Sequence, residues 1–365
     1  MVFNWKDCTL GDVITLQRGF DLPSSKRQDG KVPVVSSSGI SGYHNVAKVK
    51  APGVVTGRYG TLGEVFHIDQ DFWPLNTTLY VKNFKDNDHK FISYFLKTLN
   101  LAHQNTAGAV PGLNRNALHL LPVKIPSLPT QKKIAAILSA YDDLIENNTR
   151  HIKILEEMAE TLYHEWFVKF RFPGHEHTKM VDSELGLIPE SWEVASFTDI
   201  ADILSGGTPK TKILEYWNGN IPFFTPKDAP DNFYVTETEK SITEIGLSKC
   251  NSKLYPKNIV FITARGTVGK AVMAAVDMAM NQSCFALRGK DEINQYFVLL
   301  TIKNHVQHLQ KAASGATFDA IIIDTFRRLL VIKPDILLIN TFGHLMSPMF
   351  DLVLNLIQKN SNLRR

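Results

Sequence analysis

An internal repeat with a period of about 200 residues constrains the fold of this chain most strongly. The segment from Arg58 to Gly63 (RYGTLG) matches Arg265 to Gly269 (RGTVG), and residues 74–78 match residues 279–283. From Ile134, which pairs with Phe342, the two halves align without gaps. Because the matches keep one order along both halves, the sequence predicts two similar globular units that arose by duplication.

Each half is predicted to combine short strands with helices. Runs of β-branched or aromatic residues between glycine, proline or asparagine predict strands, and apolar residues at helical spacing predict helices. Each half is therefore predicted to be an α+β unit that begins near a tryptophan, Trp5 or Trp192. The predicted strands cover residues 32–35, 53–56, 78–81, 221–225 and 258–263, and the predicted helices cover 89–100 and 295–311.

A long helix with a heptad pattern is predicted after the first unit. It starts at Pro129 and Thr130 and stops at Phe172-Pro173-Gly174. One polar residue at a heptad position, Asn148, fixes register at a cost in stability, which favours a defined antiparallel coiled coil over the alternative of a long core helix. The seam residues are Ile134, Leu138, Tyr141, Ile145, Asn148, Ile152, Leu155, Ala159, Leu162 and Trp166.

The chain end repeats this seam in a shorter helix, so part of the first helix is predicted to lack a partner within the chain. The second seam consists of Leu338, Phe342, Leu345, Met349, Leu352 and Leu356. The predicted segments are a first unit at 1–127, a long spacer helix at 128–172, a linker at 173–187, a second unit at 188–335 and a shorter spacer helix at 336–365.

Composition and charge set looser limits. Forty basic and 36 acidic side chains give a net charge of +4, which permits nucleic-acid binding without implying it. Three widely spaced cysteines fit neither a disulfide framework nor a zinc knuckle. No signal peptide is visible and no apolar run approaches the ~18 residues of a spanning helix, so we expect a cytoplasmic protein without a membrane partner.

Two glycine-containing loops carry side chains suited to DNA. An arginine binds guanine O6 and N7 bidentately or clamps a phosphate, and neighbouring glycines let the backbone approach closely. The alternative interpretation is a tight turn with an exposed arginine. The candidates from these loops are Arg58, Tyr59, Thr61, Arg265 and Thr267.

Amide, hydroxyl and basic side chains in neighbouring loops complete the candidate DNA-binding set. Amides suit adenine N6 and N7, and hydroxyls suit phosphates, although such residues also cap their own turns. These candidates are Asn76, Thr77, Arg115, Thr208, Lys210, Asn281 and Gln282, with Thr317 and Phe318 as weaker ones.

Catalytic and metal sites are not predicted. His175-Glu176-His177 lacks further ligands for a closed metal site. The segment Arg265 to Ala271 lacks the spacing and the Ser or Thr of a phosphate loop. Asp88-His89-Lys90 lies in a charged turn, and no methyltransferase tetrapeptide (Asn/Asp-Pro-Pro-aromatic) occurs. Any methylation chemistry must therefore come from another chain.

The segment Leu128 to Leu138 (LPTQKKIAAIL), followed by Asp142 to Glu146 (DDLIE), resembles the central helix of specificity subunits from type I restriction-modification systems. Trp166-Phe167 and Gly186 to Trp192 (GLIPESW) are similar to that family's junction into its second recognition domain. The resemblance covers the whole chain. It departs at Thr130, where the family often has glutamate, and the C-terminal helix lacks the family's Leu-Pro-Glu-Gln opening.

The resemblance implies two target recognition domains, each reading one half of a split DNA sequence, with the two helices as an antiparallel spacer. It implies a subunit without catalysis or cofactors of its own. Double-stranded DNA, two DNA-methyltransferase subunits with S-adenosylmethionine, and restriction subunits that use ATP and Mg are the implied partners. The alternatives are a restriction or methylation enzyme in its own right and a two-domain scaffold that binds only proteins.

Overall fold

The structure is a computed structural model that describes residues 5–104, 111–314 and 320–364, without the side chains of 312–314. It divides into two compact units, Met1–Leu144 and Ile145–Arg365. The boundary lies inside the long helix, whereas the sequence pattern places the helix between the units. Each unit has its own hydrophobic core and is described by itself.

The first unit is an α+β domain on a four-stranded antiparallel sheet with the order β2-β8-β5-β6. A three-stranded sheet, β4-β3-β7, and the antiparallel pair β1-β9 complete it. The strands are β1 Lys6–Thr9, β2 Thr15–Arg18, β3 Val32–Ser36, β4 Gly39–His44, β5 Gly53–Gly57, β6 Val65–Ile68, β7 Trp73–Pro74, β8 Thr78–Asn83 and β9 Pro122–Ile125. The α-helices are α1 Leu10–Val13, α2 His89–Thr98, α3 Arg115–His119 and the N-terminal part of α4 Leu128–Tyr163.

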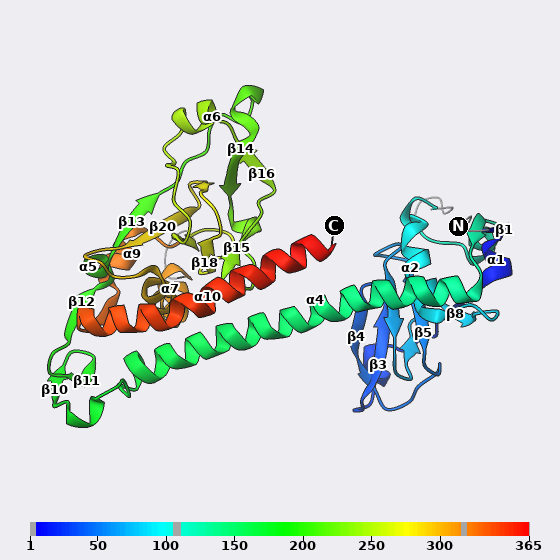
Figure 1. The fold of residues 1–365 in the computed structure, drawn as a ribbon, viewed down its shortest axis with the longest axis horizontal. Coiled ribbons are helices and arrows are strands. Elements are labelled where there is room, and N and C mark those ends of the chain that lie inside the picture. The colour runs from blue at the N-terminus through cyan, green and yellow to red at the C-terminus, as the bar shows by residue number, and fades with distance from the viewer. Residues whose placement is uncertain (1–4, 105–110, 315–319, 365) are drawn as a thin grey trace. The chain divides into compact units, whose positions relative to one another are not determined.

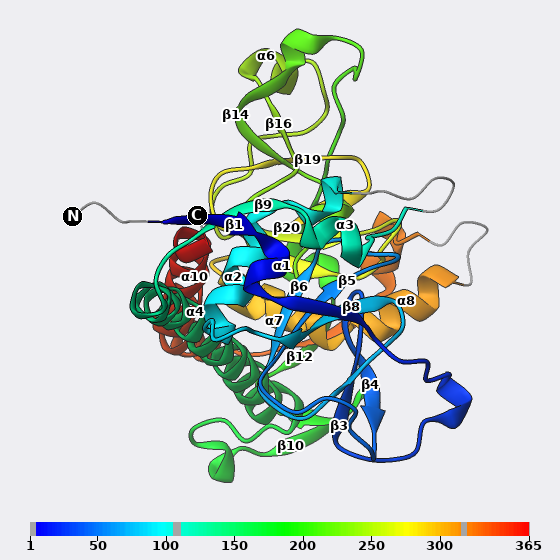
Figure 2. The same cartoon turned by 90° about the vertical axis from the view of Figure 1, so that its right-hand side faces the viewer.

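The second unit contains a five-stranded sheet with the order β13-β20-β17-β18-β15 and a three-stranded sheet, β16-β14-β19. Strands β14 and β16 and helix α6 lie together, away from α7 (Figure 1; Figure 2). The strands are β12 Glu193–Ser196, β13 Ala201–Ser205, β14 Trp217–Phe224, β15 Tyr234–Val235, β16 Lys240–Ile242, β17 Val260–Thr263, β18 Ala271–Ala274, β19 Ala279–Met280, β20 Cys284–Gly289 and β21 Leu330–Lys333. The α-helices are α5 Phe197–Ile200, α6 Glu244–Ser248, α7 Gln295–Asn304, α8 Val306–Ser314, α9 Ile323–Arg328 and α10 Ile336–Arg364.

The two units repeat one topology, which confirms the predicted duplication. The antiparallel pair β1-β9 corresponds to β12-β21, and a short capped helix follows the first strand of each pair. In the first unit, Asp12 accepts a hydrogen bond from the backbone N–H of Thr9 at 2.9 Å. Asp199 accepts the equivalent bond from Ser196, also at 2.9 Å. Both carboxylates satisfy a backbone donor at a helix start.

The long helix ends earlier than the sequence predicts. The α-helix α4 stops at Tyr163 and continues as one wider π-helical turn, His164–Val168, rather than reaching Phe172. Phe170 then adopts a left-handed backbone conformation with φ of 59°. The aromatic residues that follow leave the helix axis because they pack on the buried Trp192, whose ring centroid lies 5.1 Å from that of Phe172.

Within the second unit, α10 packs antiparallel to the C-terminal part of α4 (Figure 1). At one end, Asn148 Nδ2 donates to Asn360 Oδ1 at 2.9 Å, and both side chains are buried. At the other end, Trp166 and Phe342 pack with ring centroids 5.7 Å apart. The polar seam position therefore fixes the helix register through a side-chain hydrogen bond, as predicted.

The buried side of α10 differs from its predicted seam. Leu345 and Leu352 are 45% and 46% exposed, so their predicted place in the seam is wrong. The reason is that α10 packs against α7 as well as α4, and Asn294 before α7 donates to the carbonyl of Ile339 at 2.8 Å. The buried positions are Ile339, Phe342, Met346, Phe350, Val353, Leu354 and Leu356. On α4, Leu138 and Tyr141 precede the asparagine pair and are 37% and 48% exposed.

The linker at 173–187 contains a hairpin, in which β10 Met180–Ser183 pairs with β11 Gly186–Pro189. One further expectation needs correction. Among the described residues, α10 alone is long and apolar enough, by length and composition, to cross a membrane, contrary to the expectation from the sequence. In the structure one side of α10 packs in the core of the second unit, and its other side exposes His344 and Asp351.

Candidate nucleic-acid interface

In the first unit, three arginines line one cavity of about 440 Å³. Arg18 ends β2, Arg58 follows β5, and Arg115 begins α3. The Arg58 guanidinium lies over the Tyr59 ring, 4.4 Å from its centroid, and donates to Tyr59 Oη at 3.3 Å. Gly112 is required beneath this ring, since a Cβ there would lie 2.3 Å from Tyr59 Cε1.

The arginines of this cavity are held by the packing of β2 against α3. His119, at the end of α3, accepts a hydrogen bond from the backbone N–H of Leu16 on β2 at 2.9 Å. Burial, with Lys85 and Arg115 nearby, lowers the pKa of His119, which keeps the ring neutral and able to accept. None of the residues that line the cavity carries a carboxylate. Such a site suits phosphate oxygens or guanine acceptors.

A second cavity of about 480 Å³ gathers Arg265, Thr267 and Asn281 in the second unit. Arg265 and Thr267 follow β17, and Asn281 lies in the turn before β20. Lys227, Glu239 and Lys240 also line this cavity. The cavity thus combines three cationic side chains with one carboxylate, and Arg265 and Lys240 are exposed.

The two arginines that the sequence pairs are not structural equivalents. Arg58 N–H donates to Thr77 O at 2.8 Å, and the corresponding bond in the second unit runs from Ala264 to Ser283 O at 2.8 Å. Gly60 and Gly266 then share a positive φ, of 79° and 78°. Arg265 therefore occupies the position of Tyr59. Pairing Arg58 with Arg265 requires a gap opposite Tyr59, but the two loops have equal length: Gly63 N–H donates to Gly57 O in one unit and Gly269 N–H to Thr263 O in the other.

Two of the amide candidates join loops within their own units. Asn76 Nδ2 donates to Asp21, and Thr208 Oγ1 donates to Gln282. These bonds are equivalent in the repeat, so Asn76 corresponds to Gln282 and not to Asn281. Asn281 Oδ1 accepts from Ser283 N–H at 3.0 Å, which is the self-capping alternative, and this leaves the amide nitrogen to face the cavity.

The remaining candidates lie outside both cavities. The Thr77 carbonyl accepts from Arg58 and Tyr59, while its hydroxyl is buried without a hydrogen-bond partner among the described residues. Thr61 is exposed in the first loop, and the Lys210 carbonyl accepts from Trp217 Nε1 at 3.3 Å. Thr317 and Phe318 lie outside the described residues. The structure therefore brings together Arg58, Tyr59 and Arg115 in one unit and Arg265, Thr267 and Asn281 in the other.

Arg18, Lys227, Glu239 and Lys240 were missed by sequence reasoning. Asp88, which the sequence predicts to lie in a charged turn, caps α2 and accepts from Phe91 N–H at 2.8 Å. In the part of the chain that the structure describes, no group of three potential metal ligands occurs.

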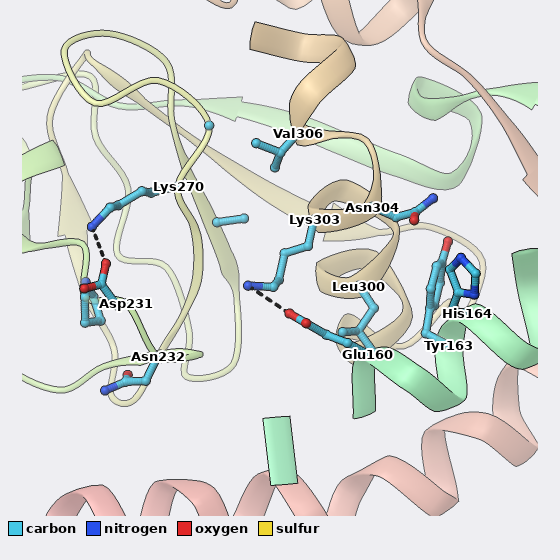
Figure 3. A pocket seen from close by; sticks show the side chains of 13 residues that line it. Glu160, Tyr163, His164, Asp231, Asn232, Lys270, Leu300, Lys303, Asn304 and Val306 are labelled. Carbon is cyan, nitrogen blue, oxygen red and sulfur yellow. Dashed lines mark hydrogen bonds and ion pairs between the residues drawn. The ribbon is translucent and has the colours of Figure 1, made fainter. Parts of the chain in front are cut away.

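A third cavity of about 470 Å³ lies beside α4 in the second unit (Figure 3). Its two lysines have carboxylate partners: Lys270 pairs with Asp231 at 2.8 Å, and Lys303 pairs with Glu160 at 3.3 Å. Burial raises the pKa of Tyr163 in its wall to about 12. Because its cations are neutralised, this cavity is less suited to an anionic ligand than the two others.

The chain thus consists of two repeated α+β units, each with a basic cavity, and α4 runs from the first unit into the second. The family model for the type I restriction modification DNA specificity domain matches residues 3–157 and 189–336. The chain belongs to this family and carries two copies of its domain.

Known proteins are similar to this chain along most of its length. The type I restriction enzyme MjaIX specificity subunit of Methanocaldococcus jannaschii is 32% identical over 157 residues, which cover 42% of this chain and 35% of that protein. The HindI specificity subunit of Haemophilus influenzae is 22% identical over 318 residues, covering 71% and 69%. The chain therefore spans about a third of the first relative and two thirds of the second.

A solved structure has the same fold. The type I restriction-modification S subunit from M. genitalium superimposes with a TM-score of 0.67 at 16% identity, over 100% of this chain and 94% of that chain.

Proposed function

We propose that this chain is the sequence-specific DNA-binding specificity subunit of a type I restriction-modification complex. It reads a bipartite target and directs adenine methylation or ATP-dependent cleavage by partner subunits. The observation that carries this proposal is the repetition of one domain with a basic cavity beside the same loop in each copy. Two similar readers in one chain suit a target with two half-sites.

The proposed partners supply the chemistry. Double-stranded DNA binds the two units, two methyltransferase subunits bring S-adenosylmethionine, and restriction subunits bring ATP and Mg. The curated relatives are named specificity subunits, which supports a role in recognition for this chain. Its own catalytic contribution is proposed to be none.

The test uses the full chain co-expressed with its methyltransferase subunit. Bound duplexes are selected from a random library and sequenced, and methylated positions are mapped in the host genome with and without the gene. We expect one target with two defined half-sites and an undefined gap. Methylation that persists without this gene, or binding without sequence preference, would contradict the proposal.

A further inference from the structure

Among the residues that line the second-unit cavity, Glu239 is the only one with a carboxylate. The other polar groups mainly offer donors: Arg265, Lys227, Lys240 and the amide nitrogen of Asn281. Among the described residues that line the first-unit cavity, none carries a carboxylate. Glu239 is exposed, and among the described residues no ion pair or side-chain hydrogen bond engages its carboxylate.

The backbone around Glu239 is held in place by neighbouring loops. Its N–H donates to Asp228 Oδ1 at 2.8 Å, and Asp228 Oδ2 accepts from both the N–H and the hydroxyl of Thr225. The preceding Thr238 hydroxyl accepts from Phe223 N–H on β14 at 3.2 Å and donates to the carbonyl of Lys240 at 2.7 Å. Glu239 thus lines the cavity from a backbone that hydrogen bonds hold in place.

A carboxylate beside DNA is repelled by the phosphates, so its presence in a basic cavity needs a compensating contact. In the major groove, the groups that a carboxylate accepts from are exocyclic amino groups, cytosine N4 or adenine N6. Arginine binds the acceptor pair of guanine in the same groove. The combination of Arg265 and Glu239 is complementary to a base-pair edge that presents both acceptors and an amino group.

We propose that Glu239 is a specificity-determining residue that accepts a hydrogen bond from the exocyclic amino group of a base in the half-site read by the second unit. This inference rests on the proposed function. It predicts that the wild-type complex demands cytosine or adenine on one strand at one position. The bound sequences distinguish the two bases.

The test compares wild type with Glu239→Gln in the full chain assembled with its methyltransferase subunit, using a random duplex library. A glutamine amide both donates and accepts, so it also binds guanine O6 or thymine O4. If the amino base is cytosine, we expect the preference for it to fall by about tenfold in Glu239→Gln. If it is adenine, which a glutamine also binds through N6 and N7, the same fall is expected in Glu239→Ala. The half-site of the first unit stays unchanged in both variants. Glu244→Gln is the matched control, because Glu244 carries the same charge in the same unit but lies outside the cavity wall.

A different result would overturn the inference. If Glu239 only offsets neighbouring cations, Glu239→Gln and Glu239→Ala will both tighten binding to all duplexes alike and steepen the salt dependence, with base preferences unchanged in both. That outcome overturns the inference and leaves the proposed function intact. Loss of sequence preference already in the wild-type complex contradicts the proposed function itself.

Discussion

The cavities of the two units share one equivalent loop but differ in their other lining segments and in chemistry. Both lie beside the loop after a central strand, and in both units an N–H in this loop bonds the carbonyl of the turn before the next strand, from Arg58 to Thr77 and from Ala264 to Ser283. The first cavity presents three arginines and no carboxylate. The second presents one arginine, two lysines and Glu239. Duplication thus keeps this hydrogen-bonded loop while the side chains and the other lining segments differ, which suits two readers of unlike half-sites.

The units also differ at their first tryptophans. Trp5 is 40% exposed, whereas Trp192 is 6% exposed against Phe167, Phe170 and Phe172. The aromatic residues that cover Trp192 come from the segment that follows α4. Equivalent tryptophans of the repeat therefore have different surroundings.

The largest expected effect comes from lengthening the helix that links the two half-site readers. Inserting seven residues of helix-forming sequence after Leu144 keeps the heptad phase and leaves the Asn148–Asn360 bond intact. The helix grows by about 10 Å, roughly three base pairs of DNA. We expect the original target to be lost and both half-sites to reappear with a longer gap in selected duplexes. A gap of unchanged length would contradict the spacer role of α4.

A substitution in the buried side of α10 should lower the stability of the second unit and leave the stability of the first unit unchanged. Phe342 is fully buried, with ring centroids of Phe167 and Trp166 at 5.0 and 5.7 Å. Phe342→Ala should lower the free energy of unfolding of the second unit by about 3–5 kcal/mol. Amide hydrogen exchange should accelerate in the second unit and not in residues 5–104. Leu352→Ala, at a 46% exposed site, is the control and should cost much less.

A buried carboxyl should make the stability of the second unit depend on pH. Burial raises the pKa of Glu156 to about 7, and Phe233 N–H donates to its carboxylate. The folded state therefore holds the proton more tightly than the unfolded state, and the free energy of unfolding falls as pH rises from about 4.5 to about 7. Glu156→Gln should be more stable than wild type at pH 8, by up to about 3 kcal/mol, and equal to it below pH 4.

Denaturant titrations at several pH values measure this effect. Glu157→Gln, which removes a neighbouring carboxyl that is 61% exposed, should leave the pH profile as in wild type. If the free energy of unfolding of Glu156→Gln depends on pH as in wild type, ionisation of the Glu156 carboxyl does not destabilise the second unit and the prediction is wrong.

Features with a repeating or periodic signal could be predicted from the sequence. The duplication, the long helix and the asparagine that fixes its register follow from spacing alone. The helix end, the buried side of α10 and the one-residue shift between Arg58 and Arg265 could not, because tertiary packing and backbone hydrogen bonds decide them. Arg18 and Glu239 carry no local signal, since they join their cavities only when distant strands meet.

The central claim is that each unit reads its own half-site, and paired arginine substitutions test it most directly. Arg58→Ala and Arg265→Ala are each assembled with the methyltransferase subunit, and binding to duplexes altered in one half-site is measured at two salt concentrations. If the arginine contacts guanine, we predict that each variant loses about 1–3 kcal/mol of discrimination in one half-site only, and that the affected half-site differs between the two variants. If the arginine contacts phosphate, the variant weakens binding to all sequences and its salt dependence becomes shallower. Loss of discrimination in the same half-site by both variants, or unchanged binding in both, would contradict the claim.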